Sequence, residues 1–162
     1  MFDPTTFTGV HTDLSIIGII AGFIVIAGLI GGRISSLWTE IYLATAVLTS
    51  ATGFGFPFTK FLPSHGVGVI SLAVLAIALL ALYVFKLSGI WRAVYAATAV
   101  IGVYFLVFVA IAQSFGKIPA LHQLAPTMSE PPFAIAQGVN LLIFAVLGIA
   151  SIRSLRSAPL AA

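Results

Sequence analysis

The chain has 162 residues, enough for one domain, and its composition excludes an ordinary soluble one. Apolar residues make up 60% of it and charged residues 7%, whereas a typical globular chain is about 25% charged. The net charge of +3 comes from seven scattered Lys and Arg residues with no basic run, which argues against nucleic-acid binding. No Cys is present, so disulfides, cysteine-bound metals and thiol catalysis are excluded. We therefore expect an integral protein of a bacterial inner membrane, surrounded by the lipid bilayer.

Five stretches are long and apolar enough to cross a bilayer, which takes about 20 mostly apolar residues. We predict spanning helices over residues 14–32, 37–56, 66–85, 91–115 and 132–152. Residues 1–13 contain no Lys or Arg, so the first stretch is predicted to be a retained helix and not a signal peptide. The second stretch contains several Thr and Ser residues, and a broken or re-entrant helix is the alternative there. The sequence predicts a single all-α domain, 1–162, folded as a compact bundle of five transmembrane helices.

The positive charges predict how this bundle is oriented. With the N-terminus outside, five of the seven cations fall on the cytoplasmic side, namely Arg33, Lys86, Arg92, Arg153 and Arg156. The outer side then holds two cations, Lys60 and Lys117, and three of the four acids. Cytoplasmic connections carry an excess of Lys and Arg, so we expect the N-terminus outside and the C-terminus in the cytoplasm. The longest connection, residues 116–131, is then an outer loop.

All three histidines fall on the predicted outer side. His11 precedes the first helix, His65 begins the third, and His122 lies in the outer loop. Polar groups inside a bilayer usually face the interior of a bundle. We therefore expect a polar pocket that opens to the outside. Its floor would comprise Thr49, Gln113, Gln137 and Asn140, and its rim His11, Lys60, His65, His122 and Glu130.

Several ligands fit such a pocket. A divalent metal held by two or three of the histidines His11, His65 and His122, with Glu130 or Asp13, is one hypothesis, because imidazole and carboxylate are suitable ligands. A haem b held by His11 and His65 is another, since Gly66 and Gly68 would leave room beside the ring. A quinone or lipid-like molecule is a third. The simpler interpretation is that the histidines are solvated at the membrane surface and the amides join helices.

Three further features have two interpretations each. Gly18 and Gly22 form a GxxxG motif, which indicates either close packing inside the bundle or a contact in a homo-oligomer. The aromatic segment 51–61 is either part of an outer aromatic belt or a wall for a planar ligand. Glu40 begins the second helix, where the helix dipole favours an acid, and Arg33 or Arg92 is its expected partner; a proton relay is the alternative.

No motif for catalysis is present. The sequence has no GxSxG, P-loop, HExxH or GxGxxG pattern. We therefore expect a small polytopic inner-membrane protein, without enzymatic activity, that binds a ligand or cofactor at its outer face. One alternative is an accessory or structural subunit of a larger membrane complex or homo-oligomer. Another is a small channel or transporter, which the almost wholly apolar inner halves of the first, third and fifth helices disfavour.

Overall fold

The computed structural model describes residues 5–57 and 63–158, and its regular structure is helical throughout this part of the chain. The elements in chain order are α1 (Phe7–Ile30), α2 (Ser36–Thr52), the 3₁₀ turn η1 (Gly53–Gly55), α3 (Pro63–Leu79), the π-helical turn η2 (Leu80–Val84), α4 (Trp91–Lys117), α5 (Pro119–Leu124) and α6 (Pro131–Ser157). Four helical segments in the described residues are long and apolar enough to cross a membrane: Phe7–Ile30, Ser64–Val84, Trp91–Lys117 and Pro131–Ser157. The chain is thus an all-helical membrane protein, as its composition predicts.

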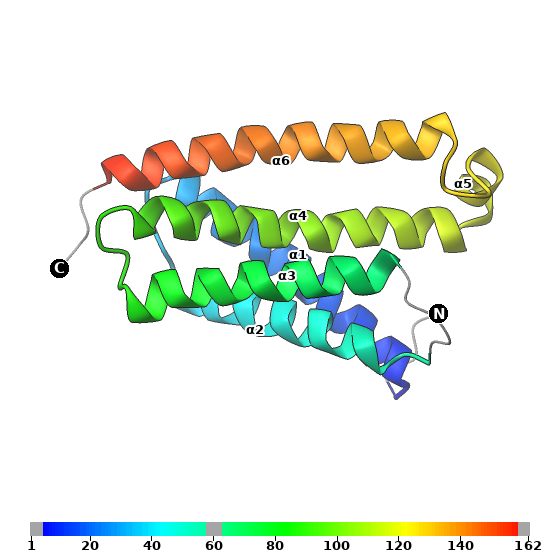
Figure 1. Ribbon diagram of the computed structural model, residues 1–162, viewed down its shortest axis with the longest axis horizontal. Helices are drawn as coiled ribbons and strands as arrows, with labels where there is room; N and C mark the ends of the chain where they lie inside the picture. The colour runs from blue at the N-terminus through cyan, green and yellow to red at the C-terminus, as the bar shows by residue number, and fades with distance from the viewer. Residues whose placement is uncertain (1–4, 58–62, 159–162) are drawn as a thin grey trace.

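The long helices run lengthwise through the molecule, with α1 crossing behind α3 and α4 (Figure 1). Helix α4 is central, because it packs against α1, α3 and α6, while α2 packs mainly against α1. One end of the bundle carries the α1–α2 and α3–α4 connections and the end of α6. The opposite end carries the start of α1, η1 and the α4–α6 connection (Figure 1). We call the first the basic end and the second the outer end, the latter after the side to which the sequence prediction assigns it.

The helix boundaries differ from the prediction at several places; α6, for example, ends at Ser157 and not at residue 152. Helix α1 begins at Phe7 and not at residue 14, because the Thr6 hydroxyl caps it by accepting a hydrogen bond from the Gly9 amide at 3.0 Å. Helix α2 ends at Thr52 and tightens into η1, so it is not among the four segments long enough to span. The predicted outer loop also contains a short helix, α5.

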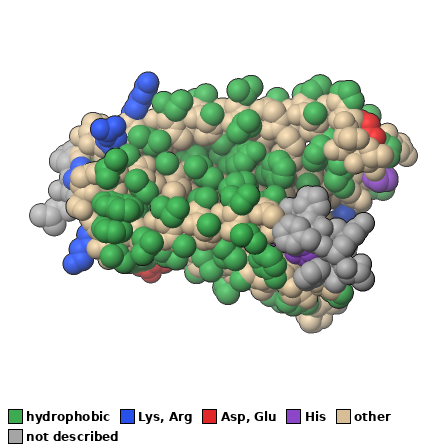
Figure 2. Space-filling view, in the orientation of Figure 1, with side chains coloured by type: hydrophobic (Ala, Val, Ile, Leu, Met, Phe, Trp, Pro, Cys, Tyr) green, Lys and Arg blue, Asp and Glu red, His purple; other side chains and the backbone are tan. Residues whose placement is uncertain are grey.

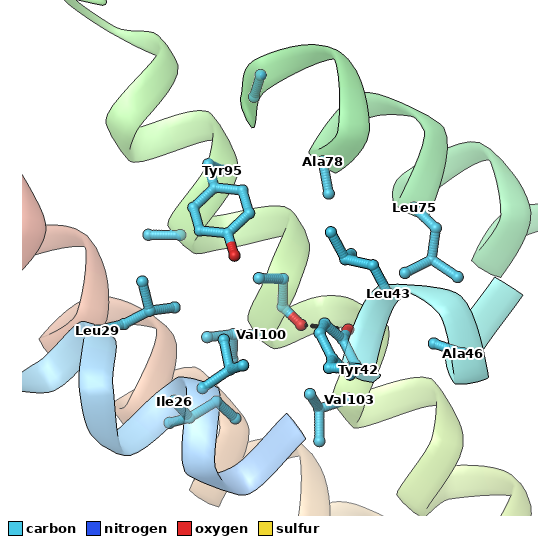
Figure 3. Close-up of a cluster of buried hydrophobic side chains, with 14 of the residues drawn as sticks. Ile26, Leu29, Tyr42, Leu43, Ala46, Leu75, Ala78, Tyr95, Val100 and Val103 are labelled. Carbon is cyan, nitrogen blue, oxygen red and sulfur yellow. Dashed lines mark hydrogen bonds between the residues drawn. The ribbon is translucent and has the colours of Figure 1, made fainter. Parts of the chain in front are cut away.

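The centre of the bundle is closely packed by α1, α2 and α4 (Figure 3). Tyr42 is fully buried there, and its hydroxyl donates to the Ala99 carbonyl at 2.8 Å. A Cβ added to Gly22 would lie 2.6 Å from Val103 Cγ2, and one added to Gly18 would lie 3.2 Å from the hydroxyl of Thr45. The GxxxG face of α1 is therefore filled by α2 and α4 of the same chain, and it is not exposed to a second copy.

Most of the positively charged side chains lie at one end of the long axis of the molecule. Lys and Arg side chains gather at the basic end, on the left of Figure 2, whereas histidines lie toward the opposite end. This follows from the topology, since the basic end holds Arg33, Lys86, Arg92, Arg153 and Arg156. The fold thus groups the same five cations that the sequence assigns to one side of the membrane.

Candidate functional site

His11 is positioned at the outer end by the last turn of α2. Its Nδ1 lies 2.9 Å from the hydroxyl oxygen of Thr52, and that hydroxyl donates to the Leu48 carbonyl at 2.7 Å. Because the single hydroxyl proton is used on Leu48, the imidazole Nδ1–H is the donor in the His11 contact. The edge of the His11 ring also packs against Phe56, with ring centroids 5.1 Å apart. His11 therefore joins α1 to the end of α2.

His65 makes a similar contact from α3. It is 5% exposed, and its ring stacks on Phe54 of η1 with centroids 5.8 Å apart. A Cβ added to Gly68 would lie 3.1 Å from the Phe54 ring, so this glycine allows the close approach of the aromatic side chain. Phe54 thus fills the space that a haem beside Gly68 would need. Residues 58–61 of the predicted aromatic segment, including Lys60, lie outside the described residues.

His122 and Glu130 lie apart from these contacts, on the α4–α6 connection. His122 is exposed on α5. The Glu130 carboxylate accepts hydrogen bonds from the Thr127 hydroxyl at 2.7 Å and from the Ser129 amide at 3.1 Å. The bond from Thr127 is the main reason that the pKa of Glu130 lies below its ordinary value. Glu130 is therefore held in a turn that precedes α6.

The described residues contain no group of three or more His, Asp or Glu side chains that could hold a metal ion. The predicted metal site of His11, His65 and His122 is therefore not assembled within them. His11 and His65 each contact η1 or its neighbours, whereas His122 is carried on the separate helix α5. Hydropathy predicts the depth of a residue in the membrane, but not its position around the bundle.

The predicted floor of the pocket is brought together in part. Gln137 and Asn140 lie on the face of α6 that packs against α4, and Gln137 Nε2 donates to the Phe108 carbonyl at 3.0 Å. Asn140 is 5% exposed. Gln137 Oε1 and Asn140 Nδ2 are buried, and neither has a hydrogen-bond partner among the described residues. We call these two residues the amide pair. Gln113 is exposed on α4, and Thr49 lies on α2 with its buried hydroxyl also lacking a partner.

Aromatic side chains that the sequence reasoning did not single out adjoin the amide pair. Phe144, one turn after Asn140, has its ring centroid 5.9 Å from that of Tyr104 and 5.8 Å from that of Phe23. Tyr104 in turn lies 5.9 Å from Phe108, whose carbonyl accepts from Gln137. The spacing of four residues between Asn140 and Phe144, and between Tyr104 and Phe108, was the available signal.

The arrangement has a definite binding chemistry. An unpartnered Nδ2–H can donate to a carbonyl oxygen, and an unpartnered Oε1 can accept from a hydroxyl group. Leaving such groups unpaired in an apolar interior costs about 1–3 kcal/mol each. Stacking on the neighbouring rings would favour a planar or unsaturated molecule. The amide pair with its aromatic surroundings is therefore the candidate site for a small apolar ligand that carries oxygen groups.

The surface hollows lie elsewhere. Two of them, of about 510 and 250 Å³, open between α2 and α3 toward the basic end, and both are lined by Glu40 and Tyr83. Glu40 forms no ion pair with a described residue. Arg92, one of its two expected partners, instead donates to the carbonyls of Leu87 and Ala158, at 3.3 and 2.9 Å.

No protein-family model matches the chain, and comparisons with curated proteins and with solved structures find no match.

Proposed function

We propose that the chain is a five-span protein of a bacterial inner membrane, with its N-terminus outside, that binds a membrane-soluble ligand at the amide pair and has no enzymatic activity. In addition to the four long apolar segments, the remaining span is α2 continued by η1. Their 17 and 3 residues reach about 31 Å at the rises of α and 3₁₀ helices, close to the thickness of the hydrocarbon core. The five cations at the basic end support a cytoplasmic location for that end.

The observation that carries the ligand proposal is the pair of unpartnered atoms, Gln137 Oε1 and Asn140 Nδ2. In the bilayer no bulk water satisfies such atoms, so a bound molecule would remove the cost of leaving them unpaired. A quinone or a lipid-like molecule with carbonyl and hydroxyl groups matches one donor and one acceptor beside aromatic rings. Metal and haem are less well supported, because the histidines contact η1 or lie on α5.

The ligand would enter from the bilayer. Helix α6 is the least buried of the four spans found, with 11% of its most apolar stretch buried, against 44% for α4. Its outward side chains Ile135 and Leu142 are 64% and 68% exposed. A displacement of the outer part of α6 from α4 would uncover the amide pair, because Gln137 and Asn140 lie on the face between these two helices.

The experiment compares the molecules that copurify in mild detergent. Gln137→Leu with Asn140→Leu removes both amides, and Gln113→Leu is the matched control, because it removes an exposed amide near the outer end of α4. We expect mass spectrometry of extracts to show one oxygen-bearing apolar molecule in stoichiometric amount with wild type and control, and at least tenfold less with the double variant. Equal amounts in all three proteins, or no bound molecule in any, would contradict the proposal.

A second candidate function is that of a subunit in a homo-oligomer or larger membrane complex. Gly138 lies on α6 with no atom within 4 Å of an added Cβ, and exposed Ala134 precedes it by four residues. Small residues at this spacing allow the close approach of another transmembrane helix. Because the chain has no Cys, the variant Gly138→Cys can be tested by disulfide crosslinking in membranes. The control is Ile77→Cys, at an exposed position of α3. A crosslink specific to Gly138→Cys supports this candidate, and its absence counts against it.

A further inference from the structure

The hollows between α2 and α3 form one elongated feature, which we call the α2–α3 groove. Its wider part, of about 510 Å³, is lined by the apolar side chains Leu43, Ala44, Val47, Leu48 and Leu79. Glu40 and Tyr83 line both this part and the narrower part of about 250 Å³. The groove is thus apolar along most of its length and carries a carboxylate and a phenol toward the basic end. A volume of 300–1,000 Å³ is typical of sites for small molecules.

The local fold explains why the groove is open. Helix α2 packs more extensively against α1 than against α3. At the basic end, α3 widens into η2, where the Phe85 amide donates to the Leu80 carbonyl at 2.9 Å. Such π-helical turns often occur at functional sites. Tyr83 belongs to this turn and is 53% exposed, so its side chain extends along the groove and not into the core.

Glu40 is the one charged side chain among the described residues that line the groove. Glu40 is the fifth residue of α2, about 6 Å along the helix from its first residue, so it lies near the membrane surface. Asp13 and Glu130 belong to the outer end, which makes Glu40 the single acid of the basic end within the described part of the chain. Its carboxylate is exposed and has no ion pair there. An acid beside an apolar groove is complementary to an amphiphile whose head carries a positive charge.

We propose that the α2–α3 groove binds one phospholipid whose headgroup carries a primary ammonium group, of the ethanolamine type. The ammonium donates to the Glu40 carboxylate, and an acyl chain lies along Leu43, Val47 and Leu79. Lys86 follows the turn that carries Tyr83 by two residues, so it adds a positive charge at the same end of the bundle, where the lipid phosphate would lie. This site is separate from the amide pair and does not depend on it; the orientation proposed above places the lipid in the inner leaflet.

The test is lipid binding to the full chain, measured by native mass spectrometry. Phosphatidylethanolamine, phosphatidylcholine and phosphatidylglycerol with the same acyl chains are each titrated into delipidated protein. We expect phosphatidylethanolamine to bind at least tenfold more tightly than phosphatidylglycerol. Phosphatidylcholine should also bind more weakly than phosphatidylethanolamine, because its methylated nitrogen has no N–H to donate. Glu40→Gln should abolish the preference, whereas Glu130→Gln, which neutralises an acid of the outer end, should retain it.

A second variant tests the apolar part of the groove. Ala44→Phe places a ring where the acyl chain would lie, and it should weaken binding of all three lipids while Glu40 stays in place. Size-exclusion profiles matching wild type show that both variants remain folded. The proposal is overturned if Glu40→Gln keeps the preference for ethanolamine, if Ala44→Phe leaves binding unchanged, or if the groove retains a basic helix of another protein and no lipid.

Discussion

Tyr42 at the centre of the bundle and Asn140 in α6 are both buried polar side chains, but they differ in whether their polar atoms are paired. The Tyr42 hydroxyl donates to the Ala99 carbonyl within the cluster drawn in Figure 3. A Cβ added to neighbouring Gly102 would collide with this hydroxyl. Within residues 5–57 and 63–158, Asn140 Nδ2 has no partner, and no atom lies within 4 Å of a Cβ added to nearby Gly138. A paired group in a filled core stabilises the fold, whereas a buried group left unpaired destabilises it unless another molecule pairs with it. The comparison therefore separates a structural centre from a candidate binding region.

The largest expected effect tests the packing half of this comparison. Gly102→Ala places a methyl group against the Tyr42 hydroxyl and 3.1 Å from Leu75, and it should destabilise the protein by about 1–3 kcal/mol, as overpacking of a filled core does. Gly138→Ala meets nothing within 4 Å and should stabilise α6 by up to about 1 kcal/mol, because Ala is the better helix former. Unfolding in mixed detergent micelles measures both. Similar losses of stability in Gly102→Ala and Gly138→Ala would show that the centre and the periphery are packed equally tightly.

Substitutions at Tyr42 and Asn140 test the part of the comparison that concerns paired and unpaired polar groups. Their expected effects on stability are smaller and opposite in sign. Tyr42→Phe removes a buried hydrogen bond and should cost about 0.5–1.5 kcal/mol. Asn140→Leu removes an unpaired donor from an apolar site, so delipidated protein should keep or gain stability. Thermal unfolding of the two variants in the same detergent provides the measurement. A loss at Asn140 as large as that at Tyr42 would mean that the asparagine is paired within the protein.

The smallest expected effect concerns the turn before α6. The pKa of Glu130 is lowered, chiefly by the Thr127 hydroxyl, so its carboxylate stabilises the turn at pH values above the ordinary pKa of a glutamate. This contribution should be lost as the pH falls through the lowered pKa, and the Thr127 and Ser129 amides should then exchange hydrogen faster, after correction for the intrinsic rate. Glu130→Gln should remove the pH dependence. An unchanged profile in that variant would show that another group controls the turn.

Much of the fold was predictable, because apolarity and length decide which segments enter a membrane. The segments that became α4 and α6 were placed within a few residues by hydropathy. The early start of α1 was missed, since the cap at Thr6 precedes a polar stretch that hydropathy excludes. The end of α2 was placed too late, because η1 is as apolar as the helix before it and differs only in backbone geometry.

The sequence indicates at which end of each helix the candidate-site residues lie, but not which neighbouring helix they face. Gln137 and Asn140 share a face of α6 because they are three residues apart, and each has a buried polar atom there. Nothing in one sequence indicates that His65 faces Phe54, or that Gly22 faces Val103. Such contacts depend on which faces of separate helices meet. The sequence does not distinguish these faces, because each is apolar enough to contact either lipid or another helix.

Nuclear magnetic resonance can test directly whether the buried amide of Asn140 binds a molecule other than the protein. Asn140 is the only asparagine in the chain, so selective ¹⁵N-asparagine labelling gives a single side-chain amide signal. With native lipids retained, that signal should show nuclear Overhauser contacts to non-protein protons, and it should shift when the protein is stripped and returned to synthetic detergent. An identical signal in both samples, with contacts only to protons of α4 and α6, would contradict the account.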